Sequence, residues 1–338
     1  MNEARKGLNT QIRWGILGTA EIAREQVMPA FQKCANAKLK GIASRSGNTA
    51  ELATEFNIPK EYSSYEELLE DPDIDAVYVP LPNHLHAQWV KKAAARGKHV
   101  LCEKPAALTA QETKEMIEIC EKNNVYFMES MMYQFHPQHK KVKELVESGV
   151  IGDVKLMRAS FTFQLEKMED NFRLLPWSKG GGSVYDIGCY CIHALRSILG
   201  EPTEVSYCST DNSLSNDSDI AAMAVMEFDQ HIKGYFDCGM NMSTRNEYEI
   251  VGTGGVIRVS KAFIPQEDGE GVIHISTLNG LSTEEKIYDN YYVSGLEYFS
   301  ECIINNTKPI YGKSETINNV QVIEDCLEKA KISVSSRL

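Results

Sequence analysis

The sequence predicts an α/β chain with a doubly wound parallel sheet in its first part and a mostly antiparallel sheet in its second. Three observations support this fold class. Apolar strand patterns alternate with helical patterns over the first third of the chain, as in parallel sheets covered on both faces. From about Val154, strand patterns follow one another with tight links, which favours antiparallel pairing. The 338 residues are about twice the ~150 of an ordinary domain, so we expect two domains.

In the first part, short apolar runs predict five strands. Between them lie helical patterns, the first with Ile22, Val27, Ala30 and Phe31 on one face. A later helix begins near His84 and can be terminated by Gly97. The next opens with a capping-box pattern at Thr109 and Glu112. The five predicted strands are Ile12–Leu17, Leu39–Ala43, Ala76–Val79, His99–Leu101 and Val125–Met128.

The second part is dominated by strands, with two long helices at about Gly182–Leu199 and Glu315–Val334. Tight links at Asp229-Gln230 and Gly254-Gly255 predict hairpins. The predicted strands are Val154–Leu165 (with one register shift), Glu204–Ser209, Ala221–Phe228, Ile232–Cys238, Glu247–Val251 and Val256–Val259.

Composition excludes several classes of protein. Hydrophobic residues make up 43% and charged residues 24%, which are ordinary globular values. The net charge of −12 argues against nucleic-acid partners and anionic membrane surfaces. The longest apolar run, Ile220–Met226, is far shorter than the ~20 residues of a membrane-spanning helix, and no signal-peptide pattern opens the chain. We therefore expect a cytoplasmic protein.

Cysteine and histidine spacing predicts neither a disulfide framework nor a metal site. The nine cysteines include no Cys-x-x-Cys pair and are best interpreted as reduced core thiols. The histidines give His84-x-His86 and His136-x-x-His139 but no four-ligand zinc set.

A turn suited to a dinucleotide follows the first strand. Gly18 provides the tight turn, Ala20 leaves room for a phosphate, and Ala23 permits close helix packing. Amide groups at the helix N-terminus would hold the pyrophosphate. Ala20 stands where the usual motif has a second glycine, so a plain tight turn is the alternative.

The end of the second strand predicts which nicotinamide cofactor binds. An acidic residue there would bind the ribose 2′-hydroxyl and repel a 2′-phosphate, but no acid occurs before Glu51. Ser44 can donate a hydrogen bond, and Arg45 can meet the phosphate and stack on adenine. This pattern favours NADP. The alternative for Arg45 is a solvated surface side chain.

Two further loops lie at predicted carboxyl ends of strands, where parallel sheets bind ligands. The first is Pro80–His86, in which Asn83 could cap the following helix, contact a cofactor, or both. The second is Cys102–Pro105. Lys104 in this loop could share in general acid–base chemistry if partly desolvated, or could be an ordinary surface lysine.

The helix after Gly180–Gly182 carries titratable groups on one stripe. Asp186, Tyr190 and His193 fall within about 60° of one another at ~100° per residue. Such a face is costly to bury unless it borders a polar site. Structural alternatives are a Ser183–Asp186 capping box, a buried Tyr190 ring and a core His193.

Taken together, these motifs resemble the glucose–fructose oxidoreductase, inositol dehydrogenase and rhizopine-catabolism (Gfo/Idh/MocA) family. The resemblance covers nearly the whole chain. Tyr190 stands where inositol dehydrogenases usually carry histidine, as in the dihydrodiol and xylose dehydrogenase branch. Gln134 stands where an arginine is frequent. The matching segments are residues 15–23, 80–86, 103–105, 133–137, 149–154 and 181–190.

The resemblance implies a Rossmann domain at residues 1–133, a substrate-binding domain with an open, mostly antiparallel sheet at 134–312, and a C-terminal helix at 313–338. It implies a homodimer or homotetramer formed through that sheet. Lys104, Tyr190 and Asp186 would be catalytic, and no metal is implied. NADP is the expected cofactor, with NAD as the alternative. Its expected contacts are Gly18, Thr19, Ala20, Glu21, Ile22, Ser44, Arg45, Leu81, Pro82, Asn83, His86, Glu103 and Lys104.

The expected reaction is reversible hydride transfer between NADP(H) and a carbinol or carbonyl carbon of a sugar, cyclitol or related polyhydroxylated molecule. Tyr190 would act as acid–base, Lys104 would hold the substrate oxygen, and Asp186 would position a neighbouring hydroxyl. Other interpretations are a trans-dihydrodiol dehydrogenase, a glycosidase that retains its nicotinamide, and a non-catalytic nicotinamide sensor.

Overall fold

The structure is a computed structural model that describes residues 11–335 except 46, 168–170, 214–216 and 266–268. The chain folds into two compact units. The first contains the described residues of Met1–Ala107, Gln111–Met132 and Tyr292–Thr316, and the second contains those of Leu108–Ala110, Tyr133–Tyr291 and Ile317–Leu338.

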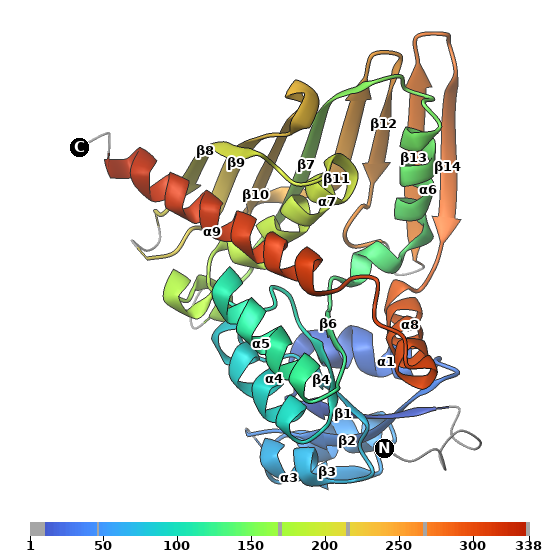
Figure 1. Ribbon diagram of the computed structural model, residues 1–338, viewed down its shortest axis with the longest axis vertical. Coiled ribbons are helices and arrows are strands. Elements are labelled where there is room, and N and C mark those ends of the chain that lie inside the picture. The colour runs from blue at the N-terminus through green and yellow to red at the C-terminus, as the bar shows by residue number, and fades with distance from the viewer. Residues whose placement is uncertain (1–10, 46, 168–170, 214–216, 266–268, 336–338) are drawn as a thin grey trace. The chain divides into compact units, whose positions relative to one another are not determined.

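The first unit is built on a six-stranded parallel sheet with the order β3-β2-β1-β4-β5-β6 (Figure 1). The chain runs outward from β1 to β3, then starts again beside β1 and runs the other way to β6. Sheets of this kind bind ligands at the carboxyl ends of the two strands where the order reverses, here β1 and β4. The predicted doubly wound sheet is confirmed. Its strands are β1 Ile12–Leu17, β2 Ala37–Ala43, β3 Lys60–Tyr62, β4 Ala76–Val79, β5 His99–Cys102 and β6 Phe127–Glu129.

Helices cover the first unit's sheet, and β4 is buried along its whole length. The first crossover contains a π-helical turn, η2, which ends two residues before Pro29. Proline has no amide donor and clashes with an α-helical carbonyl, so the wider turn accommodates it. The helical elements are η2 Ala23–Val27, α1 Met28–Phe31, α2 Thr49–Glu55, α3 Tyr65–Glu70, η3 Asn83–Leu85, α4 His86–Ala95, α5 Ala110–Lys122 and η4 Met132–Phe135.

A late helix, α8 (Tyr291–Asn305), also packs into the first unit, apart from its first residue. Trp14 of β1 is fully buried, its ring centroid lies 5.9 Å from that of Phe299, and its Nε1 donates to Ser300 Oγ at 3.1 Å. The sequence analysis expected residues 292–312 in the second domain. The structure differs because the apolar face of α8 is buried against Trp14.

The second unit contains an eight-stranded sheet with the order β14-β13-β12-β11-β7-β10-β9-β8. Among its described strands only the β10–β7 pair is parallel, so the expected mostly antiparallel sheet is confirmed. The predicted hairpins occur at η8 Asp229–His231 and at Thr253-Gly254. The strands are β7 Val154–Gln164, β8 Glu204–Asp211, β9 Ala221–Glu227, β10 Lys233–Gly239, β11 Asn241–Gly252, β12 Gly255–Ser260, β13 Glu270–Thr277 and β14 Ser282–Tyr288.

Three helices, α6 (Pro137–Glu147), α7 (Cys189–Leu199) and α9 (Lys313–Ser335), lie on one face of this sheet (Figure 1). The short elements η5 Phe172–Leu174, η6 Trp177–Lys179 and η7 Val184–Gly188 lead into α7. No helix of the described part covers the other face, which carries a ladder of paired charges. Arg158 contacts Glu247 at 3.4 Å and Glu249 at 3.0 Å, and Arg245 pairs with Asp237.

Within the described residues, no helix combines the length and apolar character needed to cross a bilayer. The same residues contain no group of three or more His, Cys, Asp or Glu side chains arranged to hold a metal ion.

Candidate functional site

The turn after β1 brings three predicted cofactor segments together. Gly18 has a φ of +123°, and its amide donates to Ala43 O of β2 at 2.8 Å. A Cβ at Gly18 would lie 3.2 Å from Leu81 Cδ2 of the loop after β4. The positive φ and this close approach explain the requirement for glycine. Thr19 and Ala20 follow in the same turn.

The helix begins at the next two predicted residues, Glu21 and Ile22. The amides of Ala23 and Arg24 return to Ala20 O at 2.9 and 3.2 Å, closing the first turn. The glycine turn and the start of this helix therefore form the strand–turn–helix unit that a pyrophosphate site requires.

Polar side chains from two loops meet beside this turn. Thr19 Oγ1 donates to Asn48 Oδ1 at 2.8 Å, and Ser44 Oγ donates to the same oxygen at 3.2 Å. Ser44 is buried, so its hydroxyl is held rather than free to rotate in water. Sequence analysis predicted Thr19 and Ser44 but missed Asn48, although it lies in the same short loop after β2.

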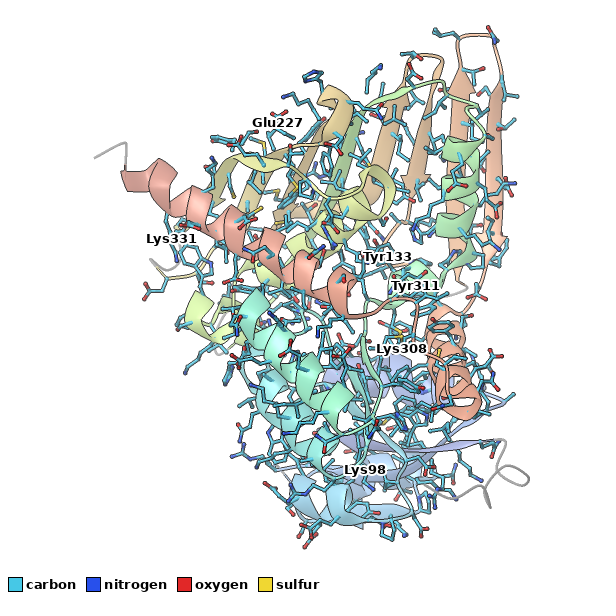
Figure 2. The ribbon with its side chains drawn as sticks, viewed as in Figure 1. Lys98, Tyr133, Glu227, Lys308, Tyr311 and Lys331 are labelled. Carbon is cyan, nitrogen blue, oxygen red and sulfur yellow. The ribbon has the colours of Figure 1, made fainter. Side chains whose placement is uncertain are left out.

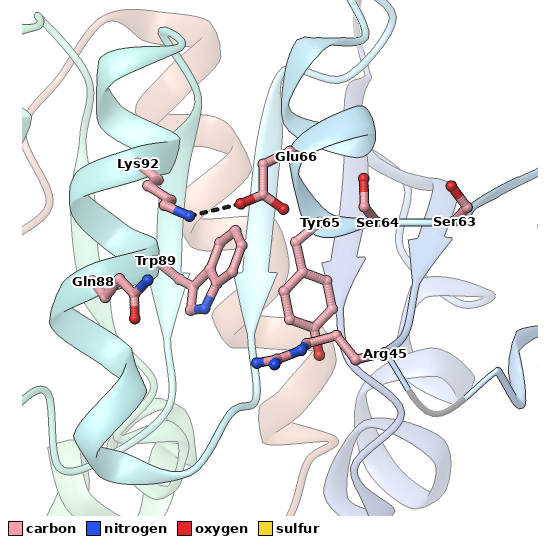
Figure 3. A pocket seen from close by; sticks show the side chains of 8 residues that line it. All are labelled: Arg45, Ser63, Ser64, Tyr65, Glu66, Gln88, Trp89 and Lys92. Atoms are coloured by element: carbon pink, nitrogen blue, oxygen red, sulfur yellow. Dashed lines mark hydrogen bonds and ion pairs between the residues drawn. The ribbon is translucent and has the colours of Figure 1, made fainter.

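Arg45 lines a cavity of about 340 Å³ in the first unit, shown in Figure 3. Two aromatic side chains form part of its wall, since Tyr65 and Trp89 meet edge to face with centroids 4.7 Å apart. Lys92 Nζ lies 4.1 Å from the Trp89 ring centroid and 2.6 Å from Glu66 Oε1. The lining residues are Arg45, Ser63, Ser64, Tyr65, Glu66, Gln88, Trp89 and Lys92.

The lining of this cavity fits a nucleotide. Arg45 and Lys92 supply two positive charges against the single carboxylate of Glu66, and aromatic walls suit a flat base. Burial raises the pKa of Tyr65, and the nearby Arg45 opposes that rise. The phenol therefore stays protonated and adds a neutral polar group to the wall.

The loop that carries Lys104 is fixed from several directions. Glu103 Oε1 accepts a hydrogen bond from Tyr78 OH at 2.7 Å, and Glu103 Oε2 accepts one from the Lys104 amide at 3.3 Å. Beyond Lys104, the Ala106 amide donates to the buried Glu129 at 2.8 Å. Lys104 itself is half-buried. Its backbone is held rigidly while its side chain keeps access to solvent.

His86 connects the two cofactor loops of the first unit. Its ring is fully buried, with Nε2 2.6 Å from Leu81 O and Nδ1 2.9 Å from Pro105 O. Burial, together with the positive charge of Lys104, lowers the pKa of His86 to about 4. Both ring nitrogens face backbone oxygens, so His86 holds the loops around Leu81 and Lys104. Between them, Pro82 and Asn83 lead into η3 and are partly exposed.

The second unit holds Asp186 and Tyr190 in one helical segment that begins with η7 and continues as α7. The Asp186 carboxylate accepts from Arg173 Nε at 3.0 Å. Ser183 Oγ donates to the buried Asp219 rather than capping the helix, so the capping alternative for Ser183 and Asp186 is wrong. Asp219, 36 positions away in sequence, binds the Ser183 hydroxyl in place of the local capping partner.

Tyr190 is half-buried on a bed of aromatic rings. Its centroid lies 5.4 Å from Phe161 and 5.8 Å from both Phe263 and Tyr133. Tyr133 (Figure 2) in turn has its hydroxyl 2.6 Å from His193 Nδ1. These contacts limit the positions that the Tyr190 ring can take.

His193 is buried, and burial holds its pKa well below the ordinary value. It is therefore neutral near pH 7, and its Nδ1 is engaged by Tyr133. These facts favour the structural interpretation of His193 over a direct catalytic one.

Comparison with known proteins follows the same division. Residues 12–131 match the model for the oxidoreductase family with an NAD-binding Rossmann fold. Residues 139–258 match the model for the GFO/IDH/MocA C-terminal domain. The chain belongs to the Gfo/Idh/MocA family. The expected resemblance is thereby confirmed.

Among similar Gfo/Idh/MocA proteins is D-xylose 1-dehydrogenase (NADP(+)) 2 of Haloferax volcanii, 34% identical over 96% of this chain and 99% of that protein. A trans-1,2-dihydrobenzene-1,2-diol dehydrogenase of Mus musculus is 31% identical over 76% and 77%. Among solved structures, a 3-ketoreductase from Actinomadura kijaniata in complex with NADP and TDP-benzene has a TM-score of 0.88 at 27% identity, covering 94% of this chain and 98% of that one.

Sequence reasoning missed several residues that line or support the candidate site of each unit. Arg173 lies 13 residues before Asp186, and nothing in the sequence pairs the two. Asp219 belongs to none of the motifs recognised in the sequence. The cavity residues Tyr65 and Trp89 lie in helices α3 and α4 and looked like ordinary amphipathic positions.

Proposed function

We propose that this chain is an NADP-preferring oxidoreductase that interconverts a CH–OH group and a carbonyl on a sugar, cyclitol or related polyhydroxylated molecule. The observation that carries the proposal is Tyr190, a half-buried phenol on an aromatic bed, in one helical segment with the ion-paired Asp186. The NADP-dependent xylose dehydrogenase and the ketoreductase in complex with NADP named above support the same class. The first unit would bind the dinucleotide and the second the substrate.

The residues of the first unit fit NADP. The Gly18 turn has the positive φ of a tight strand–turn–helix connection, and the cavity beside Arg45 offers two cations and aromatic walls. Gly18, Thr19, Ala20, Glu21 and Ile22 would hold the pyrophosphate. Further contacts would come from Ser44, Arg45, Leu81, Pro82, Asn83, Glu103 and Lys104, with His86 acting through the loops that it connects.

In the proposed mechanism, the first unit would hold NADP(H), which would supply or accept the hydride when bound. Tyr190 Oη exchanges the proton of the substrate oxygen as general acid–base. Lys104 Nζ would donate a hydrogen bond to that oxygen and so orient it for the proton exchange. Asp186, oriented by Arg173, accepts a hydrogen bond from a neighbouring substrate hydroxyl.

The test is absorbance at 340 nm with NADP⁺ and then NAD⁺, across aldoses, cyclitols and a trans-dihydrodiol. We expect reduction with NADP⁺ and one substrate class. No change in absorbance with any substrate of the panel, while NADPH still binds, would contradict the proposal for these substrates. Retention of the nicotinamide through purification would then indicate the glycosidase alternative. NADPH binding without turnover of any substrate, and without any effect of Lys104→Met, would indicate the sensor.

Arg45→Ala should weaken NADPH binding far more than NADH binding. A charge-assisted hydrogen bond to the 2′-phosphate contributes about 1.5–3 kcal/mol, so we expect a loss of roughly 10- to 100-fold for NADPH. Fluorescence titration with both cofactors measures the difference. Lys38→Ala is a matched control, because this exposed cation lies toward the other end of the strand that precedes Arg45. Equal losses for the two cofactors would overturn the role given to Arg45.

We also propose that the chain forms a homodimer or homotetramer through the helix-free face of the eight-stranded sheet. The charges on that face are already paired within the sheet, which lowers the cost of covering them. Light scattering after size exclusion should give a dimer or tetramer mass. Arg158→Glu would place a third acid beside Glu247 and Glu249 and should shift the mass toward the monomer. A monomer mass for the protein without the substitution would contradict the proposal.

The expected cytoplasmic location stays a prediction.

A further inference from the structure

We propose that Asp219 is a positioning residue for the reaction: a buried carboxylate that fixes the start of the helix carrying Asp186 and Tyr190. This inference rests on the proposed function. Asp219 lies just before β9, far in sequence from both site residues, and only 1% of its surface is exposed.

Three donors converge on the Asp219 carboxylate. Trp177 Nε1 donates to Oδ1 at 2.7 Å, while Ser183 Oγ and the Val184 amide, the latter at 3.1 Å, donate to Oδ2. The indole and amide groups are donors only, so they fit an ionised carboxylate better than a carboxylic acid. Burial raises the pKa of Asp219, and these hydrogen bonds oppose that rise.

The backbone around Asp219 reinforces this arrangement. The Ser183 amide donates to Asp219 O at 3.0 Å, and the Trp177 amide donates to Asp217 O at 2.7 Å. Gly182 has a φ of +103°, and a Cβ there would lie 2.1 Å from Asp219 Oδ1. The carboxylate thus occupies the space that any side chain at position 182 would need.

The same hydrogen-bond network extends to the side chains that are proposed to bind the substrate. The Asp186 amide donates to Gly182 O at 3.0 Å, and the Gly182 amide donates to Arg173 O at 2.7 Å. Arg173 in turn holds the Asp186 carboxylate. Asp219 therefore connects the first helical turn, the loop carrying Arg173 and the Asp186 side chain into one rigid group. Tyr190 follows on the same helix, so its placement depends on the same anchor.

The test compares Asp219→Asn with Asp217→Asn, the same change at an exposed position two residues away. The new side chain in Asp219→Asn would present an amide NH₂ group where the native carboxylate only accepts. A displacement of the reacting groups by about 1 Å can cost on the order of 10²-fold in rate. We expect Asp219→Asn to lower kcat by roughly that factor with NADPH affinity unchanged, and Asp217→Asn to retain kcat.

Two readouts do not depend on activity. The chain has three tryptophans, so the Trp177 indole N–H is one of three such signals by nuclear magnetic resonance. It should shift in Asp219→Asn and stay in place in Asp217→Asn. Amide hydrogen exchange over residues 183–190 should become faster in Asp219→Asn only. Should that variant fail to fold, Ser183→Ala removes one donor and should give a smaller change in the same direction.

The outcomes separate this inference from the proposed function. Faster exchange, a shifted indole signal and a lower kcat support the positioning role. Unchanged exchange overturns the anchor even if the protein catalyses no reaction in the substrate panel. Faster exchange with unchanged kcat overturns the link between the anchor and catalysis, while leaving the oxidoreductase proposal intact.

Discussion

Tyr190→Phe should lower turnover by roughly 10²–10⁴-fold while NADPH affinity stays nearly unchanged, because general acid–base catalysis contributes about that much to rate. The substitution removes one hydroxyl and preserves the ring. The aromatic contacts of Tyr190 with Phe161, Phe263 and Tyr133 are therefore retained. Steady-state kinetics on the substrate found in the panel, with NADPH titration alongside, measure the effect.

Tyr185→Phe is the matched control for that experiment. Tyr185 lies in the same helical segment, is buried, and donates its hydroxyl to Leu108 O at 2.9 Å. Removing this hydroxyl should cost about 0.5–1.5 kcal/mol of stability and leave turnover in place. Similar turnover losses in both variants would show a general structural effect. Full turnover in Tyr190→Phe would remove Tyr190 from the mechanism.

Phe299→Ala should lower the free energy of unfolding of the first unit by about 3–5 kcal/mol, as is typical for a large-to-small change at a fully buried aromatic residue. Phe299 is completely buried and packs against Trp14. Urea unfolding followed by tryptophan fluorescence measures the loss. This prediction also checks that α8 belongs to the first unit.

Ile304→Ala supplies the control within the same helix. The Ile304 side chain is 40% exposed, so its truncation should change stability by no more than about 0.5 kcal/mol. Equal destabilisation by Phe299→Ala and Ile304→Ala would contradict the packing of α8 described above.

The regular parts of the fold could be predicted because they rest on local apolar runs. Five strands of the parallel sheet and the two hairpins were expected close to where they occur. The strand β3 was missed because Lys60–Tyr62 is short and mostly charged. The strand β14 was missed because Ser282–Tyr288 is polar and largely exposed, so its pairing with β13 leaves no apolar alternation in the sequence.

The candidate site could be predicted where one segment carries the signal. The positions of Gly18, Lys104 and Tyr190 follow from short motifs at strand ends and on one helix. Contacts between distant segments have no signature in the local sequence. Arg173, in a loop, binds Asp186, and Asp219, which precedes β9, binds Ser183. Such pairs are set by tertiary packing, which a local pattern does not encode.

The return of α8 to the first unit has a consequence for synthesis on the ribosome. Trp14 and Ser300, which share a hydrogen bond, are 286 residues apart in sequence. Domains at the start of a chain generally fold first as they emerge, at about 5–20 residues per second. Trp14 also packs against Phe31, with ring centroids 5.5 Å apart, and that contact is available early. The contacts with Phe299 and Ser300 can form only after almost the whole of the second unit has been synthesised, so the first unit completes its packing late.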